Sequence, residues 1–572
     1  MQLRLRPVDD LVVSRLATAL RVRPATARCL VARGVYEPRD AQGFIDPRLA
    51  ALRPPAGLAG LPRAVERLAD AVVRGERIGV FGDYDVDGVT TAALLTSFLR
   101  AAGATVEVAV ARRDAGYGFT SAAAADFVAR GCSLIVTGDC GTSDLDAIST
   151  ASALGAEVIV VDHHTVPKDG NHPSLSLVNP YRADSTFPFR GMASVGLGFY
   201  VAAAVRTELR DRGHFGSRPE PDVRDLLDLV ALGTIADLVP LAAENRILTA
   251  LGLKRLQSRA RPGVAALLAA AGVEQEREVD ARTVAWKLAP RINAPGRLGA
   301  AEPSLALLLA TAETAAERAQ ALEAANTERR AIQDRVVTEA LERVGEGDPG
   351  PAIVVSGEGW PAGVVGIVAA KLVDRYQRPA FVIGIDPVTG IGRGSARTSG
   401  GVDLYRALAE AAPCLERFGG HAAAAGFTIQ RDSVAALAEV LGGACARLAQ
   451  GSGPVTAGRE LDAEVRLAEI DERLATELAG LGPFGQDNPS PTLVTRNVRV
   501  TAARRVGDGS HLKLTVEDDR STTRTAIGFG LGSRPIEVGA RVDLAFLPTV
   551  STWQGRRSAE LELADLALAN VE

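Results

Sequence analysis

The residues of this 572-residue chain best suited to chemistry are three aspartates at alternate positions, Asp83, Asp85 and Asp87, directly after the apolar run 77–81. In an extended segment alternate side chains point to the same face, so the three carboxylates can converge. Carboxylates held close together repel one another, and a bound cation removes that repulsion. The spacing therefore predicts a cation site.

Two alternative interpretations of this acidic stretch have to be weighed. An EF-hand calcium loop also begins Asp-x-Asp-x-Asp-Gly, but it requires a glutamate at its twelfth position and a helix on either side. The twelfth residue counted from Asp83 is Leu94, and the segment before the loop has the pattern of a strand. A solvated acidic turn is the second alternative, and the surrounding sequence argues against it.

The segments around the aspartates alternate between short apolar runs and helical patterns. Strands are predicted at 77–81, 105–110, 133–137 and 157–161, and helices at 89–102, 121–130 and 143–154. This alternation is typical of a parallel α/β sheet, which binds ligands outside the carboxyl ends of its strands. Three of these strands end in candidate ligands, namely the aspartate triplet, Asp139 and the run Asp162-His163-His164. Their meeting at one sheet edge favours a functional site.

The histidines and the remaining carboxylates need separate treatment. Adjacent side chains of an extended chain point to opposite sides, so we expect His163 to bind metal and His164 to serve the substrate or support the site. Asp162 is expected to orient the neighbouring imidazole rather than to touch a metal. Asp237 lies in an otherwise apolar helical run, where an unpaired carboxylate is costly. A ligand and an ordinary helix end before Pro240 remain equal alternatives for it.

The whole chain is expected to divide into five sections. Residues 1–55 predict a helical lead-in, 56–300 the α/β domain with the candidate ligands, and 301–349 a long connector helix. Residues 350–452 predict a second α/β domain. Residues 453–572 contain short strand patterns separated by turns, which indicate a β-barrel of the OB type.

Two of these sections carry weaker signals of binding. In the second α/β domain, glycines next to Arg393, Ser395 and Arg397 would let backbone and guanidinium groups approach a phosphate closely, although glycine-rich turns are common. In the barrel, basic edges that bind nucleic acid are predicted from Arg504, Arg505, Lys513, Arg556 and Arg557. A purely structural barrel is the alternative.

Composition limits the class of protein. The hydrophobic share of 47% and the charged share of 23% are ordinary for a soluble globular protein, and no apolar run is long enough to cross a membrane. The start lacks the core of a signal peptide, and the five cysteines are scattered without a Cys-x-x-Cys pair. We therefore expect a cytoplasmic protein. With a net charge of −5, any binding of nucleic acid would depend on local basic patches.

The order of these motifs resembles that of the DHH phosphoesterase superfamily. Its four motifs match Gly82–Gly88, Asp139 before Gly141, Asp162–His164 and Gly233–Asp237. Further stretches narrow the resemblance, namely Pro290–Arg297, Gly392–Thr398, Phe418–His421 and Pro483–Pro489. From about residue 55 to its end, the chain is similar to the RecJ family of bacterial single-strand-specific exonucleases.

The resemblance implies roles for individual residues. A pair of divalent cations, Mn²⁺ or Mg²⁺, would be held by Asp83, Asp85, Asp87, Asp139, His163 and Asp237. Asp139 would bridge the two cations, and His164 would contact the scissile phosphate, with Asp162 beside it. The terminal 5′ phosphate and the adjoining backbone would be held by Arg112 or Arg113, Arg297, Ser395 and Arg397. Tyr117 would stack on a base, and His421 belongs to a substrate-binding motif of the DHH-associated domain.

The implied activity is two-metal hydrolysis of single-stranded DNA from 5′ to 3′, releasing 5′ mononucleotides, in DNA repair and recombination. The implied partners are single-strand-binding protein and a RecQ-type helicase, and the lack of a coiled-coil pattern favours a monomer. One alternative is a DHH phosphodiesterase that acts on short oligoribonucleotides or cyclic dinucleotides. Another is a non-catalytic DNA-clamping factor on the same scaffold.

Three positions depart from the pattern of the family. Cys140 stands where asparagine is usual, Ala396 replaces a commoner glycine, and Pro295 replaces a commoner alanine. Because Cys140 adjoins Asp139, a shifted metal preference is one expected consequence. No ligand position is lost.

Overall fold

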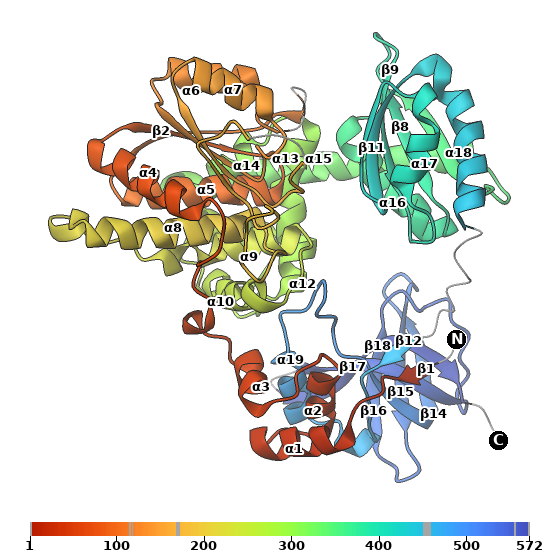
Figure 1. The fold of residues 1–572 in the computed structure, drawn as a ribbon. Coiled ribbons are helices and arrows are strands. Elements are labelled where there is room, and N and C mark those ends of the chain that lie inside the picture. Colours follow the sequence, from red (N-terminus) through yellow and green to blue (C-terminus); the bar gives the residue numbers. More distant parts are fainter. Residues whose placement is uncertain are drawn as a thin grey trace. The chain divides into compact units, whose positions relative to one another are not determined.

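The computed structural model describes residues 3–113, 116, 118–167, 172–449, 459–553 and 556–569 (Figure 1). The chain forms two compact units. The larger consists of Pro55–Asp237 and Lys254–Val455, and the smaller of Met1–Pro54, Leu238–Leu253 and Thr456–Glu572. Within the described part of the chain, no helix is both long and apolar enough to cross a membrane.

A five-stranded parallel sheet in the order β3-β2-β4-β5-β6 organises the first half of the larger unit. Its strands are β2 (Arg77–Gly82), β3 (Thr105–Val110), β4 (Leu134–Gly138), β5 (Glu157–Val161) and β6 (Ser176–Val178). Residues of β4 are buried throughout, as expected for a parallel strand covered on both faces. The predicted parallel sheet is therefore confirmed, with β6 as an additional edge strand.

Helices cover both faces of this sheet (Figure 1). One face is covered by α6 (Ser121–Ala129) and α7 (Leu145–Ala153), and the other by α4 (Leu61–Arg74), α5 (Val86–Ala101) and α8 (Ser194–Asp211). The helices that follow are α9 (Leu227–Ala236), α10 (Ala243–Ser258), α11 (Pro262–Ala270), α12 (Ala281–Thr283), α13 (Ala289–Leu298) and α14 (Glu302–Leu308). A π-helical turn, Val284–Leu288, joins α12 to α13.

The connector predicted over 301–349 is divided into two helices. After α14 the chain interrupts the helix at Leu309–Thr311, and α15 then runs without a break over Ala312–Val344. Thr311 is the extended N-cap of α15, with ψ 170°. Because the interruption contains neither proline nor glycine, the helical pattern of the sequence did not reveal it.

The second half of the larger unit contains a mixed sheet in the order β10-β11-β9-β8-β7. Its strands are β7 (Ile353–Glu358), β8 (Ala380–Ile385), β9 (Ile391–Arg397), β10 (Arg417–Gly420) and β11 (Ala424–Gln430). One face packs on α15 and α16 (Ala362–Tyr376), and the other on α17 (Leu404–Glu410) and α18 (Val434–Ala449). Together these confirm the predicted second α/β domain.

The glycine-rich segment of this domain is a central strand, β9, rather than a turn. It pairs with β8 on one side and with β11 on the other. A Cβ atom at Gly394 would lie 2.1 Å from the ring of Phe427 on β11. Glycine is therefore required at this position because a neighbouring aromatic ring occupies the space of a side chain.

The smaller unit contains the predicted OB-type barrel. Its five strands are β14 (Leu493–Val506), β15 (His511–Glu517), β16 (Thr523–Gly528), β17 (Arg541–Trp553) and β18 (Arg556–Leu568). The barrel closes because β14 pairs with both β15 and β17, and β16 pairs in parallel with β18. The short strand β13 (Ala463–Glu464) and helix α19 (Glu472–Ala479) precede the barrel in the chain.

The helical lead-in belongs to the same unit as the barrel. Strand β1 (Leu3–Leu5) pairs in parallel with β12 (Arg459–Leu461), and α1 (Asp10–Leu20), α2 (Pro24–Val31) and α3 (Pro38–Ile45) follow β1. Leu16 and Leu30 share one hydrophobic core with Leu478 of α19 and Phe546 of β17. The two ends of the chain therefore fold as one unit.

This shared core makes a testable prediction. We expect Leu16→Ala to lower the free energy of unfolding of the smaller unit by about 3 kcal/mol, because the fully buried side chain leaves a cavity in the common core. Leu11→Ala, on the same helix at a side chain that is 83% exposed, should change it by less than about 0.5 kcal/mol. Denaturant unfolding of the full chain measures both, and equal effects of the two substitutions would contradict the shared core.

Candidate metal centre

The candidate ligands lie where adjacent strands of the parallel sheet end. The N–H groups of Asp83, Asp139 and Asp162 donate to the carbonyl oxygens of Gly138, Val161 and Val178, at 3.2, 3.0 and 3.1 Å. These bonds continue the ladders of β2, β4 and β5 by one residue. The three aspartates consequently stand side by side at the carboxyl edge of the sheet, as the sequence predicted.

The side chains form three groups whose ligand atoms lie within 4.8 Å of one another. These groups are Asp83/Asp85/Asp139, Asp87/His163/Asp237 and Asp139/His163/His164. The imidazole Nε2 of His163 lies 3.3 Å from Asp139 Oδ1 and 3.5 Å from Asp237 Oδ2. All six residues predicted as metal ligands therefore meet, and Asp139 belongs to two of the groups.

The N-terminus of α8 positions Asp87. Both carboxylate oxygens accept backbone N–H groups, from Ser194 at 2.7 Å and from Val195 at 3.0 Å. The hydroxyl of Ser194 also donates to Asp139 Oδ1 at 3.1 Å, so one residue contacts two candidate ligands. Sequence reasoning missed Ser194, because two of these three contacts come from backbone groups and no motif marks them.

Asp139 itself adopts an unusual backbone conformation. Its φ of 63° lies in the left-handed region, which residues other than glycine rarely adopt. The conformation places its carboxylate between the two ends of the site, in contact with both Ser194 and His163. A strained backbone conformation of this kind is typical of functional positions, where the surrounding structure maintains it.

Asp162 and His164 form a hydrogen-bonded pair. His164 Nδ1 lies 2.7 Å from Asp162 Oδ1, which also accepts the N–H groups of His163 and His164. Although burial opposes protonation, the bond to Asp162 raises the pKa of His164 to about 9. Burial, assisted by the charge of His164, lowers the pKa of His163 to about 4. At neutral pH His163 is thus a neutral candidate ligand and His164 a cation.

The two histidines do not point to opposite sides as strand geometry predicts. Their rings lie 4.9 Å apart, and both have a ligand atom within 4.8 Å of Asp139. The reason is that β5 ends at Val161, so the alternation of an extended strand no longer governs residues 163 and 164.

Several carboxylates of this site lack hydrogen-bond partners or have raised pKa values. Asp83 is completely buried, and neither of its oxygens has a hydrogen bond of good geometry, although the N–H groups of Tyr84 and Gly118 approach it. Burial and the charge of Asp85 raise the pKa of Asp83 to about 8 and that of Asp87 to about 7. Burial and Asp87 raise the pKa of Asp237 to about 9. Carboxylate oxygens and a neutral imidazole, crowded and unsatisfied, fit hard divalent cations.

Cys140 is not part of this donor set. Its thiol is buried and donates to the carbonyl oxygen of Gly138 at 3.6 Å. It packs in the apolar cluster between the sheet and helices α6 and α7. Burial and the charge of Asp83 raise the pKa of the Cys140 thiol well above its usual value, so it stays protonated. Among the described residues, Cys140 belongs to none of the groups of possible metal ligands, and the shifted metal preference stays a prediction.

A cluster of arginines forms in the same unit around the start of α16. Arg297 Nη1 donates to Gly363 O at 2.9 Å, and Arg397 Nη1 donates to Ser395 Oγ at 3.0 Å. A Cβ atom at Gly366 would lie 3.0 Å from Ser395 Oγ and 3.2 Å from Arg397 Nη2. The positive end of a helix and several guanidinium groups are thus close together, as in binding sites for phosphate.

Arg113, rather than Arg112, joins this cluster. Its Nε donates to Gly296 O at 2.9 Å, and its guanidinium lies 4.1 Å above the ring of Tyr84. Arg112 is exposed and lies 3.5 Å from Glu302. Burial, followed by the charges of Arg113, Arg329 and Arg397, lowers the pKa of Arg297 to about 10. Tyr84 and Arg329 were not predicted from the sequence.

The remaining predicted substrate contacts are Tyr117 and His421. Tyr117 lies outside the described residues. His421 is exposed in the turn between β10 and β11, and its N–H donates to Ala424 O at 2.8 Å. Ala424 is the register partner of Arg397, so His421 lies at the same end of that sheet as the arginine.

Comparisons with known proteins agree with this architecture. Residues 77–234 match the DHH family, N-terminal domain, residues 350–447 match the DHHA1 domain, and residues 461–565 match the RecJ OB domain. The chain is 35% identical to the single-stranded-DNA-specific exonuclease RecJ of Bacillus subtilis, over 99% of this chain and 70% of that protein. It is also 35% identical to the RecJ of Escherichia coli, over 98% of both chains.

Solved structures of RecJ are also similar to this chain. The crystal structure of RecJ from Thermus thermophilus in complex with Mn²⁺ superposes with a TM-score of 0.83 at 29% identity, covering all of this chain and 80% of that one. The corresponding Mg²⁺ complex superposes with a TM-score of 0.78. With its three domain matches and relatives of 35% identity over nearly its full length, the chain belongs to the RecJ family of single-stranded-DNA-specific exonucleases.

Proposed function

We propose that this protein is a single-strand-specific exodeoxyribonuclease that hydrolyses DNA from 5′ to 3′ with two divalent cations and releases 5′ mononucleotides. The observation that carries the proposal is the meeting of Asp83, Asp85, Asp87, Asp139, His163 and Asp237 at one sheet edge. Family membership supports the choice of substrate, since the relatives are named for activity on single-stranded DNA. Such an activity belongs to DNA repair and recombination.

The six ligand residues would hold Mn²⁺ or Mg²⁺, the ions present in the solved relatives. When bound, the ions would neutralise charge on the scissile phosphodiester and acidify a water molecule. Asp139 is proposed to be the ligand that the two cations would share. It groups with Asp83 and Asp85, and its Oδ1 lies 3.3 Å from His163, which groups with Asp87 and Asp237. Its contact with Ser194 Oγ would fix the direction of the carboxylate.

His164 is proposed to contact a non-bridging oxygen of the scissile phosphate. Its bond to Asp162 keeps the imidazole protonated at neutral pH and fixes the orientation of the ring. An imidazolium at this place stabilises the negative charge that develops during in-line attack. Asp162 would act by holding His164, since it already accepts N–H groups from His163, His164 and Thr142.

The arginine cluster is proposed to hold the terminal 5′ phosphate. Arg113, Arg297 and Arg397 form no ion pair with any residue that the structure describes, so their charges remain available for an anion. Tyr84 and Arg113 connect the two sites, because Tyr84 follows Asp83 and Arg113 bonds to Gly296 beside Arg297. A phosphate held here while the next phosphodiester reaches the metal ligands would explain release of single nucleotides from a 5′ end.

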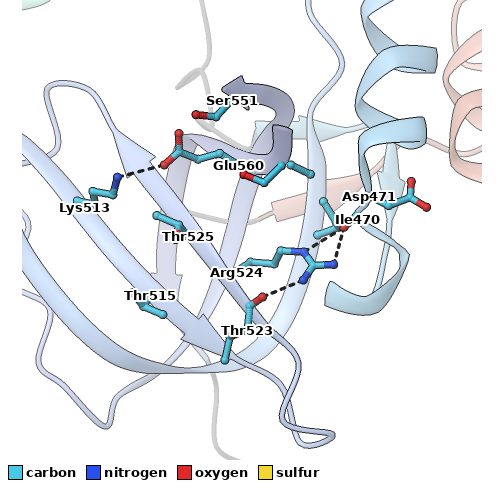
Figure 2. A pocket seen from close by; sticks show the side chains of 11 residues that line it. Ile470, Asp471, Lys513, Thr515, Thr523, Arg524, Thr525, Ser551 and Glu560 are labelled. Carbon is cyan, nitrogen blue, oxygen red and sulfur yellow. Dashed lines mark hydrogen bonds and ion pairs between the residues drawn. The ribbon is translucent and has the colours of Figure 1, made fainter. Parts of the chain in front are cut away.

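The barrel is proposed to bind the strand through polar groups more than through charge. The barrel has a groove of about 520 Å³, whose lining side chains are seen in Figure 2. In it Lys513 lies 3.3 Å from Glu560, and Arg524 donates twice to Ile470 O. Hydroxyl groups dominate the rest of its lining, from Thr515, Thr523, Thr525, Ser551 and Ser558. Of the predicted basic edge, Arg557 pairs with Glu472, the side chain of Arg556 lies outside the described part, and Arg504 and Arg505 are exposed.

The alternatives fit less well. A phosphodiesterase for short oligoribonucleotides or cyclic dinucleotides has no evident need of the barrel, whereas the relatives align across it. A non-catalytic clamp has no need of a complete set of ligands. Single-strand-binding protein and a RecQ-type helicase remain proposed partners, since both supply single strands, and a cytoplasmic monomer remains the proposed state.

The metal ligands generate the central prediction. We expect the protein to degrade 5′-phosphorylated single strands only with Mn²⁺ or Mg²⁺, and Asp139→Ala to reduce the rate at least about 10³-fold, because the shared ligand is lost. Asp146→Ala, an exposed aspartate on α7, is the matched control and should retain activity. Degradation by Asp139→Ala at the rate of the control would contradict the proposal.

The same assay separates the alternatives by substrate. With strands labelled at either end, we expect mononucleotides to appear from the 5′ label first, because the arginine cluster holds that end. Short oligoribonucleotides and cyclic dinucleotides should be hydrolysed more slowly than DNA. Faster hydrolysis of the small substrates would favour the phosphodiesterase, and release from the 3′ label would contradict the proposed direction.

The raised pKa values predict how pH affects metal binding. In the metal-free protein, Asp87, Asp83 and Asp237 hold protons up to pH 7–9, whereas the unfolded chain releases them near 3.8. Their contribution to stability is therefore present at low pH and is lost as pH rises through this window. Cations displace these protons, so the increase of melting temperature caused by Mn²⁺ should be larger at pH 8.5 than at pH 6.5. Thermal melts of wild type and Asp139→Ala, with and without Mn²⁺, test this; an increase independent of pH would contradict it.

A further inference from the structure

The connector helix α15 has a buried stripe that changes character in its middle. The buried positions follow one another at alternating spacings of four and three, which places them on one face of the helix. They are Ala315, Ala319, Leu322, Asn326, Arg329, Gln333, Val336 and Ala340. The two ends of the stripe are apolar, whereas its centre is polar. Burial of polar groups in a helix seam is costly, so the centre requires an explanation.

The side chain of the central residue, Arg329, is hydrogen-bonded to two neutral amide side chains. Its side chain lies in a site where only 7% of the residue is exposed. Nη1 donates to Gln333 Oε1 at 2.7 Å, and Nη2 donates to Asn326 Oδ1 at 2.6 Å. No ion pair joins Arg329 to a carboxylate among the residues that the structure describes. The amides therefore fix the guanidinium in place without an ion pair. The carboxylate of Asp334 on the same helix attracts this charge through space, although it is exposed and pairs with Lys371 at 3.2 Å.

This charge lies within electrostatic reach of Arg297, on a helix that packs against the helices of the arginine cluster. Helix α15 packs against α13, which carries Arg297, and against α16, whose Gly363 accepts the bond from Arg297. The positive charge of Arg329 is one of those that lower the pKa of Arg297. Arg113, Arg297, Arg329 and Arg397 thus gather several unpaired cations, which repel one another until an anion is present.

We propose that the clamp of Asn326, Arg329 and Gln333 is a positioning element of the phosphate-binding cluster, and that it makes the enzyme select strand ends that carry a terminal phosphate dianion over ends that carry a hydroxyl. The inference rests on the proposed nuclease function. A dianion gains about twice as much as a monoanionic phosphodiester from a fixed positive charge. The connector helix is then part of substrate recognition rather than only a link between two domains.

The choice of amides is the strongest argument for this role. Aspartate or glutamate at position 326 or 333 would bind the guanidinium equally well, but would cancel its charge. Asparagine and glutamine orient the guanidinium and preserve its field. A purely structural clamp gains nothing from this restriction, because a compensated ion pair would be the less costly way to bury Arg329.

Gln333→Glu is accordingly the most informative variant. It keeps the size of the side chain and its bond to Arg329, and it adds a charge that compensates the guanidinium. Arg329→Gln removes the charge instead. Arg330→Gln is the matched control, since Arg330 is the next residue of α15 but is exposed to solvent. All three substitutions change the net charge of the helix by the same amount.

The test compares kcat/KM for one single strand prepared with a 5′ phosphate and with a 5′ hydroxyl. We expect the wild-type ratio of the two values to fall about tenfold in Gln333→Glu and in Arg329→Gln, and less than twofold in Arg330→Gln. Gln333→Glu compensates a buried charge but loses the 3.5 Å hydrogen bond from Gln333 Nε2 to Asp334, so its melting temperature should stay close to that of the wild type. Binding of the same two strands, carrying a fluorescent 3′ label, should show the same loss of preference in EDTA, where no hydrolysis occurs.

The outcomes distinguish this inference from the proposed function. A wild-type ratio near one, or an unchanged ratio in folded Gln333→Glu and Arg329→Gln, overturns the inference and leaves the nuclease proposal intact. If the ratio falls equally in Gln333→Glu, Arg329→Gln and Arg330→Gln, the inference is also overturned, because an exposed charge on the helix would then have the same effect as the buried one. Absence of metal-dependent hydrolysis in the wild type instead defeats the proposed function, while the binding measurement in EDTA still tests the clamp.

Discussion

Repulsion among buried carboxylates is the constraint on which the rest of this structure depends. Asp83, Asp87 and Asp139 are almost completely excluded from solvent, and their pKa values are raised because burial and neighbouring acids disfavour the charged form. The sheet imposes this arrangement, because the ladders of adjacent strands end at the same level. The N-terminus of α8 offsets part of the cost by donating two N–H groups to Asp87. The remaining cost is what a bound cation relieves.

A second concentration of charge, of opposite sign, lies in the same unit. The arginines around α13, β9 and the start of α16 have no carboxylate partners among the described residues, just as Asp83 has no good donor. Tyr84 connects the two, since it follows Asp83 in the chain and its ring lies against Arg113. A phosphodiester chain presents repeated negative charges, and these suit both a site that holds cations and a site that is itself cationic. The fold therefore has two electrostatic features that suit the proposed substrate.

The sequence was informative where topology alone determines position. Asp83, Asp139 and Asp162 could be predicted to meet, because parallel strands place their carboxyl ends at one edge. It was uninformative where an interaction comes from distant backbone, as with the N–H groups of Ser194 and Val195. It also failed where a neighbour decides the conformation. The glycines of Ile391–Arg397 did not indicate whether the segment is a turn or a strand, whereas the ring of Phe427 requires a glycine at position 394 of a strand.

The connector helix α15 shows another limit of prediction from the sequence. Its polar residues were visible in the sequence, and their spacing with the flanking alanines could have been recognised as a buried stripe. What the spacing could not indicate is the surface that the stripe faces. Similarly, Arg112 and Arg113 are adjacent in the chain, and only the contacts with Glu302 and Gly296 separate the exposed residue from the one in the cluster.

Pairing, rather than the number of basic residues, therefore distinguishes the proposed anion site of this protein. Arginine supplies most of the positive charge of a chain whose net charge is −5, so a count of arginines carries little information. In the barrel, Lys513 and Arg557 are paired with glutamates, and Arg524 is bound to a carbonyl oxygen. In the larger unit, the hydrogen bonds of Arg297 and Arg397 to other described residues all go to neutral oxygens. A guanidinium that is buried and bound to neutral groups retains its field, and it is this retained field that a phosphate can use.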